Sequence, residues 1–453
     1  MSKQIVVIGG LAAGPSAAAK ALRVNPGVQV TLFEQSEHIS YAICEIPYYV
    51  AGDIEESSRL VVYSPEKLRQ RKGVHARILH RVEEIQSVKK VVLVRDIQTQ
   101  RVFEHHFDAL ILCTGSKTRS LGVEGEDARN VFHVKTLEDG LQIKKFISAE
   151  SPKQAVILGG GYIGIEMAEA LVRNDLDVTM IHQHALPMEG LEQEFRERVV
   201  EELRKNGVHF VPNGHTISLV RDRAGTISHV VTDRGTFPAD ILILSLGVEP
   251  NVDLARRSGV LLGKTGAVKT DERQQTNIDS IYAAGDCCEI KSLVSGRPFY
   301  LPLATVASKA AWTAGENAAG GSARFKGAIR AIAVKVFDVE VAQVGLGSVE
   351  AEQVGFNVAT NLITGKSRVG IMPRSADVTV KLIIDKLSKR LLGANVMGTE
   401  SAVLRANTLA VAIQHRLTID DVGQLDLIYA PPFAPLWDPI LIAANVSKHQ
   451  FTD

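Results

Sequence analysis

Cysteine is scarce in this chain, with four residues in 453, and Cys44 has no partner nearby in the sequence. So few cysteines exclude a disulfide scaffold and favour a reducing compartment, the cytoplasm. The next cysteine is Cys113, and Cys287 and Cys288 lie far along the chain. If Cys44 takes part in redox chemistry, the other sulfur or oxygen must come from outside the chain, as a thiol, a persulfide or a peroxide.

The sequence also lacks an excess of charge, a long apolar segment and the spacing of metal ligands. Lysine plus arginine number 51, as do aspartate plus glutamate, so nothing indicates a nucleic-acid partner. No apolar stretch reaches the ~18 residues of a membrane span, and glycines interrupt the N-terminal apolar run, unlike a signal peptide. The histidines do not have the spacing of a zinc site. The length predicts about three domains.

A nucleotide-binding unit is predicted at the start of the chain. An apolar strand over residues 3–8 leads into the glycine-rich turn 9–14, an alanine-rich helix over 15–23 and a strand over 28–33. The glycines allow the backbone to approach a pyrophosphate at the helix N-terminus, and Glu34 is placed to bind a ribose.

A second unit follows at residues 154–181, with glycine at all three positions of the G-x-G-x-x-G pattern. Its last strand ends at His182, and no acidic residue stands there. In such folds an acid at this position binds the ribose of NAD and repels the additional phosphate of NADP. The absence of this acid slightly favours NADPH; the alternative is a loop histidine without a role. Three more strand-like segments, 109–115, 241–247 and 276–286, end in glycine or Gly-Asp and predict that the second domain is inserted within the first.

Together these segments resemble the flavin-dependent pyridine nucleotide–disulfide oxidoreductases. The similarity is greatest to the branch with one active-site cysteine, which contains CoA-disulfide reductases, NAD(P)H oxidases, NADH peroxidases and persulfide reductases. It extends over essentially the whole chain, and two further segments carry it: 40–49 around Cys44 and 429–433, which begins with Tyr429.

The resemblance implies FAD in the first unit, NADH or NADPH in the second, and a homodimer. The expected fold is α/β, with two nested Rossmann-like domains and an α+β C-terminal dimerisation domain. The FAD-binding domain is expected over residues 1–116 and 247–322, the NAD(P)-binding domain over 117–246 and the dimerisation domain over 323–453. The residues expected to bind the cofactors are Gly9, Gly10, Ala12, Ala13, Gly14, Glu34, Gly115, Gly159, Gly161, Tyr162, Ile163, Gly164, His182, Gly247, Gly285, Asp286 and Ala304.

Cys44 is expected to be the single redox thiol, with a buried inert cysteine as the alternative. It precedes Pro47, a residue suited to the first turn of a helix, and the positive end of that helix would lower the thiol pKa. Electrons would pass from NAD(P)H through the flavin to oxidised Cys44. The resemblance implies that Tyr429 reaches the active site of the other subunit, where it would donate a proton to the leaving thiolate.

The expected substrate is a small CoA-linked disulfide, persulfide or polysulfide. The candidates for binding it are Lys20, Arg23, Arg59, Arg374 and Trp437, although each could instead have an ordinary surface or packing role. The chain departs from the branch at Glu45-Ile46, at 371–374, where a tyrosine pair is usual, and at Trp437. Three other functions therefore stay open: an oxidase or peroxidase with a Cys44 sulfenate, an electron-transfer reductase for a protein partner, and a flavoenzyme acting on a CoA thioester.

Overall fold

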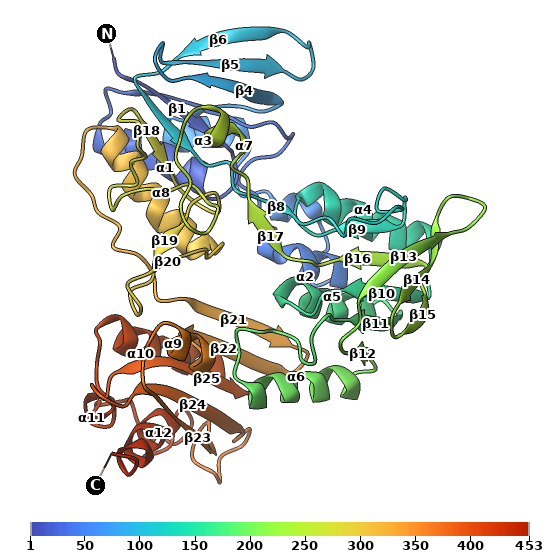
Figure 1. Cartoon of the computed structure of the whole chain (residues 1–453), viewed down its shortest axis with the longest axis vertical. Coiled ribbons are helices and arrows are strands. Elements are labelled where there is room, and N and C mark those ends of the chain that lie inside the picture. The colour runs from blue at the N-terminus through green and yellow to red at the C-terminus, as the bar shows by residue number, and fades with distance from the viewer. Residues whose placement is uncertain (1, 452–453) are drawn as a thin grey trace.

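The computed structural model describes residues 2–451 and has three parts, each built on a five-stranded sheet (Figure 1). Two of the sheets are parallel and the C-terminal one is antiparallel. Within residues 2–451, no helix has both the length and the apolar character needed to cross a membrane.

The first parallel sheet has the strand order β18-β7-β1-β2-β3. Its strands are β1 (Gln4–Ile8), β2 (Gln29–Phe33), β3 (His75–Arg77), β7 (Ala109–Leu112) and β18 (Ile281–Ala283). Helices α1 (Ala13–Val24) and α8 (Ala304–Ala318) cover one face through buried alanines. A Cβ at Gly315 would lie 2.2 Å from the Ala17 oxygen, so this glycine allows the two helices to touch.

The other face of the first sheet is covered by an antiparallel sheet of β4 (His80–Gln86), β5 (Val91–Asp96) and β6 (Val102–His106). Smaller elements surround these layers. They are α3 (Pro65–Lys72), α7 (Asp253–Arg257), β19 (Ile290–Lys291) and β20 (Pro298–Phe299).

The second parallel sheet has the strand order β12-β11-β10-β16-β9. Its strands are β9 (Val131–His133), β10 (Gln154–Leu158), β11 (Asp177–Ile181), β12 (His209–Val211) and β16 (Ile241–Leu244). The helices of this part are α4 (Leu137–Glu150), α5 (Tyr162–Val172) and α6 (Gln193–Lys205). A small sheet of β13 (Thr216–Arg221), β14 (Ile227–Thr232) and β15 (Gly235–Pro238) covers the opposite face. The chain enters and leaves through the paired strands β8 (Ser116–Thr118) and β17 (Val248–Pro250).

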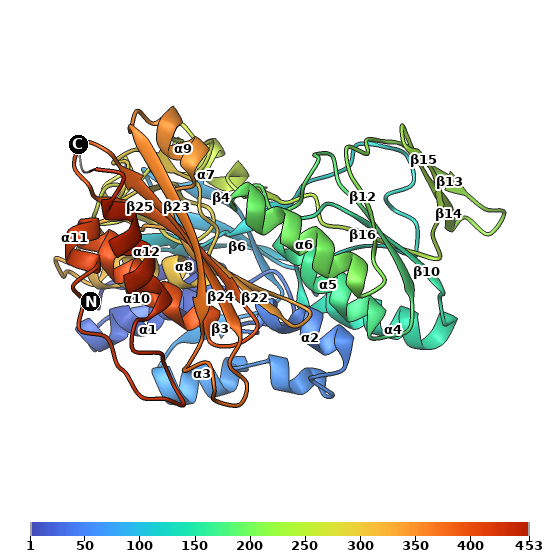
Figure 2. The same cartoon turned by 90° about the horizontal axis from the view of Figure 1, so that it is seen from below.

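The C-terminal sheet has the strand order β21-β22-β25-β24-β23. Its strands are β21 (Ala331–Val336), β22 (Val339–Gly345), β23 (Val358–Lys366), β24 (Asp377–Asp385) and β25 (Leu391–Gly398). The helices of this part are α9 (Ser348–Gln353), α10 (Ala402–Gln414), α11 (Ile419–Val422) and α12 (Pro439–Lys448). Helix α6 of the second part reaches across to this sheet, as the view from below shows (Figure 2). The buried Lys381 on β24 fixes this contact, with its ammonium 2.8 Å from carboxylate oxygens of Glu192 and Glu194.

The sequence-predicted elements form, with shifted ends. The helix expected over 15–23 begins at Ala13, and the α5 helix begins at Tyr162, directly after the glycine turn. Both helices therefore point their first turns at the carboxyl edge of their sheet, which is where nucleotides bind in such folds.

Candidate active site

A cavity at the carboxyl edge of the first sheet fits the pyrophosphate and ribose of FAD. A Cβ at Gly14 would lie 1.8 Å from the Gly9 oxygen, so only glycine permits the tight turn. No side chain caps the first turn of α1, which leaves its N–H groups available to phosphate. Glu34 Oε2 accepts a hydrogen bond from the Gly10 N–H at 2.6 Å. The predicted residues that line this cavity are Gly9, Gly10, Ala12, Ala13, Glu34, Gly115, Gly285 and Asp286.

Asp286, predicted to bind the FAD ribityl chain, lies in a short polar chain that crosses between two parts of the molecule. The Lys135 ammonium donates to Ser116 Oγ at 2.8 Å, and Ser116 Oγ donates to Asp286 Oδ2 at 3.2 Å. Burial raises the pKa of Asp286, and the charge of Lys135 and the Ser116 hydrogen bond oppose that rise. Sequence reasoning missed Lys135 and Ser116, because neither belongs to a recognisable motif.

Cys44 is a free, exposed cysteine in the 3-10 turn Ile43–Glu45, directly before α2 (Ile46–Ala51). The prediction of a lowered thiol pKa is wrong. The pKa of Cys44 is raised, first because the surrounding protein withdraws water from the sulfur, and then because of the negative charges of Glu45 and Glu166. Helix α2 has only six residues and the acidic Glu45 at its N-cap, so the negative charge of Glu45 offsets the weak positive end of the helix.

Glu166 on α5 is an acid near Cys44 whose pKa differs strongly from its ordinary value. Burial raises its pKa to about 7, and the neighbouring carboxylate of Glu169 adds to the effect. Glu169 itself accepts from Lys335 Nζ at 2.8 Å and from the Phe337 N–H at 3.0 Å. Glu166 is therefore a carboxyl group that changes charge near neutral pH beside the candidate thiol.

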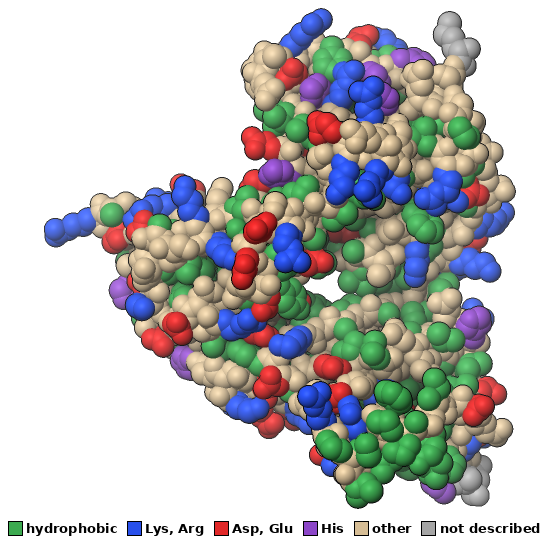
Figure 3. Space-filling model, turned by 180° about the vertical axis from the view of Figure 1, so that it is seen from behind, with side chains coloured by type: hydrophobic (Ala, Val, Ile, Leu, Met, Phe, Trp, Pro, Cys, Tyr) green, Lys and Arg blue, Asp and Glu red, His purple; other side chains and the backbone are tan. Residues whose placement is uncertain are grey.

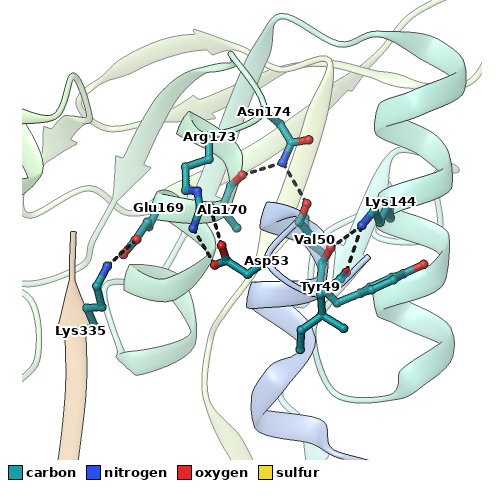
Figure 4. Close-up of polar contacts among 10 residues, drawn as sticks. Tyr49, Val50, Asp53, Lys144, Glu169, Ala170, Arg173, Asn174 and Lys335 are labelled. Carbon is teal, nitrogen blue, oxygen red and sulfur yellow. Dashed lines mark hydrogen bonds and ion pairs between the residues drawn. The ribbon is translucent and has the colours of Figure 1, made fainter. Parts of the chain in front are cut away.

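Polar contacts tie α2, which follows Cys44, to the second part of the molecule (Figure 4). Lys144 Nζ donates to the Tyr49 oxygen at 2.7 Å and lies 4.1 Å from the centre of the Tyr49 ring. Asn174 Nδ2 donates to the Val50 oxygen at 3.0 Å, and Arg173 forms two hydrogen bonds with the Asp53 carboxylate. The thiol-bearing turn is thus held against the helix that carries Glu166.

The second cavity lies at the glycine turn before α5. A Cβ at Gly164 would lie 2.2 Å from the Gly159 oxygen, which repeats the packing of Gly14 on Gly9. The Gly160 N–H donates to His182 Nδ1 at 3.1 Å. Gly159, Gly161, His182 and Gly247 line the cavity, whereas Tyr162, Ile163 and Gly164 form the start of α5. The cavity fits a second dinucleotide, since the α5 N-terminus also lacks a side-chain cap.

Comparison with known proteins agrees with this geometry. Residues 3–311 match the family described as pyridine nucleotide-disulphide oxidoreductase, and residues 332–439 match its dimerisation domain. The chain belongs to this family. It is an FAD-dependent NAD(P)H oxidoreductase, and the predicted family, fold class and cofactors are confirmed.

Several relatives of this oxidoreductase are similar over almost their whole length. The chain is 34% identical to the NAD(P)H coenzyme A polysulfide/persulfide reductase of Pyrococcus horikoshii, with 99% of each chain covered. It is 28% identical to the coenzyme A disulfide reductase of Staphylococcus epidermidis, covering 95% of this chain and 96% of that one. The solved structure of an NAD-dependent persulfide reductase from A. fulgidus superimposes with a TM-score of 0.95 at 32% identity, covering 99% of this chain and 83% of that chain.

A third cavity of the oxidoreductase adjoins the flavin cavity and shares Leu11, Ala12 and Tyr41 with it. Its lining includes the cations Arg23 and Lys72 and the aromatic residues Tyr63 and Trp312. Ala304, which was predicted to bind a cofactor, lines this cavity and not the first one. The Arg23 guanidinium lies 6.0 Å from the centre of the Trp312 ring. Among the described residues, Lys20 and Arg59 are not part of this lining, and Lys20 instead pairs with Glu316 at 2.8 Å.

Tyr429, Arg374 and Trp437 lie on the surface of the C-terminal part. The Val369 N–H donates to the Pro431 oxygen at 3.4 Å, which brings the loop of Arg374 beside the segment of Tyr429. Tyr429 is 50% exposed and Trp437 58% exposed. Within residues 2–451, none of the three lines the cavities described above.

Proposed function

We propose that this oxidoreductase uses Cys44 to reduce a CoA-linked disulfide, persulfide or polysulfide at the expense of NADH or NADPH. The observation that carries the proposal is the basic, aromatic cavity that adjoins the flavin cavity beside the Ser40–Tyr41 segment. Cys44 follows this segment within four residues and is the only exposed one of the cysteines in residues 2–451. Relatives named for CoA-dependent sulfur reduction support the same substrate class.

The proposed reaction with a disulfide consumes one disulfide, one NAD(P)H and one proton and yields two thiols and NAD(P)⁺. With a persulfide, the products are one thiol, hydrogen sulfide and NAD(P)⁺. The Cys44 thiolate attacks one sulfur of the substrate, forms a mixed disulfide and releases the first thiolate. FAD held in the first cavity would supply two-electron transfer between the nicotinamide and sulfur. Cleavage of the mixed disulfide by two electrons then releases the second thiol and restores the Cys44 thiolate.

Arg23 and Lys72 would hold the phosphates of CoA, because both are cations at the rim of the third cavity. Tyr63 and Trp312 would contact the adenine, since aromatic faces stack on bases. Lys20, Arg59, Arg374 and Trp437 stay weaker proposals, as the described residues of the cavity do not include them.

We further propose that the enzyme works as a homodimer in the cytoplasm, where its four cysteines stay reduced. Apolar side chains gather on one face of the C-terminal part (Figure 3). The exposed large apolar side chains of this part include Leu404 and Val411 on α10, Ile428, Phe433 and Leu436, which are all more than half exposed. Covering this patch with a second copy would place the partner subunit's Tyr429 as the proton donor for the leaving thiolate. The domain boundaries 1–116 with 247–322, 117–246 and 323–453 are part of this proposal.

A Cys44→Ser variant tests the function. The variant should lose reduction of CoA disulfide and CoA persulfide, while NADH or NADPH still bleaches the flavin absorbance under argon. Retention of full turnover by the variant would refute the thiol mechanism. If the wild-type enzyme instead consumes oxygen or peroxide in step with NAD(P)H and ignores the disulfides, the function is that of an oxidase or peroxidase.

A further inference from the structure

We propose that Glu189, which lies beside His182, replaces the acid that is missing from the end of β11 and selects NADH over NADPH. The inference rests on the proposed function only in that the second cavity binds the pyridine nucleotide. It concerns the position at which the two dinucleotides differ, the 2′-oxygen of the adenosine ribose.

His182 occupies the position that Glu34 has in the first unit. The Gly10 N–H donates to the Glu34 carboxylate at 2.6 Å, and the corresponding Gly160 N–H donates to His182 Nδ1 at 3.1 Å. Because Nδ1 accepts this bond, the neutral imidazole carries its proton on Nε2. Burial lowers the pKa of His182 and so favours the neutral ring, while the negative charge of Glu189 opposes this shift.

The Nε2 atom of His182 has no partner by hydrogen-bond geometry, although the side chain is only 6% exposed. A buried N–H without an acceptor is costly, so it marks a place where a ligand or a mobile group completes the bond. Two acceptors lie near this atom: the backbone oxygen of Leu186, and the carboxylate of Glu189, whose Oε1 is 3.4 Å from His182 Nε2 and 3.2 Å from His184 Nε2.

Glu189 is exposed, but its backbone is fixed on both sides. The preceding Met188 is buried, has a left-handed φ of +54°, and donates its N–H to the Gly160 oxygen at 2.9 Å. Three residues later, the Glu192 N–H donates to Asn395 Oδ1 at 2.7 Å. The loop therefore anchors to the glycine turn on one side and to β25 on the other.

His182 occupies the usual position of the acid, and the Glu189 carboxylate lies on the far side of its imidazole ring. Glu189 also lines the same cavity. A ribose 2′-hydroxyl can donate to Glu189 and accept from His182 Nε2. A 2′-phosphate would instead meet the negative charge of Glu189 at close range, where like charges repel strongly. The preference for NADPH drawn from the strand end alone is thereby reversed.

The test is calorimetric titration of the oxidised holoenzyme with NAD⁺ and with NADP⁺, which requires no turnover. Wild-type enzyme should bind NAD⁺ more tightly, and Glu189→Gln should shift the affinity ratio toward NADP⁺ by about tenfold or more. Glu197→Gln, an exposed charge removal on α6 outside the cavity lining, should leave the ratio unchanged. His182→Ala should weaken binding of NAD⁺, since it removes both the acceptor of the Gly160 N–H and the N–H proposed to donate to the ribose hydroxyl.

A wild-type preference for NADP⁺, or a ratio that Glu189→Gln leaves unchanged, would overturn the inference. The outcome is independent of the thiol chemistry, because both nucleotides can be titrated into Cys44→Ser as well. If the ratio shifts as expected and CoA disulfides are still not reduced, the proposed substrate is wrong while the selection of NADH stands.

Discussion

Replacing Glu166 by glutamine should stabilise the enzyme above neutral pH and make Cys44 more acidic. Burial raises the pKa of the Glu166 carboxyl from 4.5 to about 7. The folded state therefore binds this proton more tightly than the unfolded chain does, so wild-type stability falls as pH rises from about 4.5 to about 7. A difference of one in pKa corresponds to about 1.4 kcal/mol, so the free energy of unfolding falls by about 3 kcal/mol over this range.

Glutamine mimics the neutral carboxyl and cannot ionise, so the variant does not suffer this loss. We expect the variant to melt several degrees above wild type at pH 8 and close to it at pH 5. The measurement is thermal unfolding of the two holoenzymes at both pH values, followed by flavin fluorescence. Glu352→Gln, an exposed carboxylate on α9, is the matched control and should shift neither curve.

The thiol supplies an independent readout, because the charge of Glu166 contributes to the raised pKa of Cys44. The pH profile of Cys44 alkylation by iodoacetamide should move to lower pH in Glu166→Gln. Equal melting differences at pH 5 and pH 8, together with an unchanged alkylation profile, would refute the reasoning that Glu166 is a buried acid coupled to this sulfur.

Three further substitutions test the cofactor site, the dimer and the Asp53–Arg173 ion pair that ties α2 to the second part of the molecule, here called the tether. Gly14→Ala should yield protein with little bound flavin, because its Cβ would lie 1.8 Å from a backbone oxygen; Gly161→Ala, with open space at its Cβ, should keep normal flavin absorbance. Val411→Asp should convert the dimer to a monomer in sedimentation velocity and lower disulfide turnover, since it puts a charge in the apolar patch; a stable dimer would contradict the proposed interface. Asp53→Asn should change stability by less than about 1 kcal/mol in urea unfolding, because its pair with Arg173 is exposed; a larger loss would show that the tether is structural.

The nucleotide units could be predicted from sequence because close approach of backbone to backbone has a strict residue requirement. Gly14 packs on the Gly9 oxygen and Gly164 on the Gly159 oxygen, at distances where a Cβ has no space. The requirement is local, so it appears as a fixed spacing in the chain. Apolar strands on both sides of each turn complete the pattern.

The surroundings of Cys44 could not be predicted in the same way. A short helix after the cysteine suggested a lowered pKa, but desolvation and the charge of the neighbouring Glu45 raise it, and further charges come from distant segments. Glu166 lies on α5 and Asp286 after β18, and both raise the pKa, while Lys135 before α4 lowers it. Desolvation of the sulfur is the largest cause even though the side chain is exposed, and it depends on the segments that pack against the turn.

The end of β11 shows why an expected residue type can be absent while its function persists. The glycine turn requires only an acceptor for one N–H, and a carboxylate in the first unit or an imidazole nitrogen in the second meets that requirement equally. A carboxylate and an imidazole are not equivalent for binding the ribose, however. The Nε2–H of the imidazole donates a hydrogen bond, whereas the oxygens of a carboxylate accept one. Once His182 satisfies the backbone, the negative charge that recognises the ribose can come from any segment that reaches the same cavity. Glu189 reaches it from a loop that no strand-end motif would include.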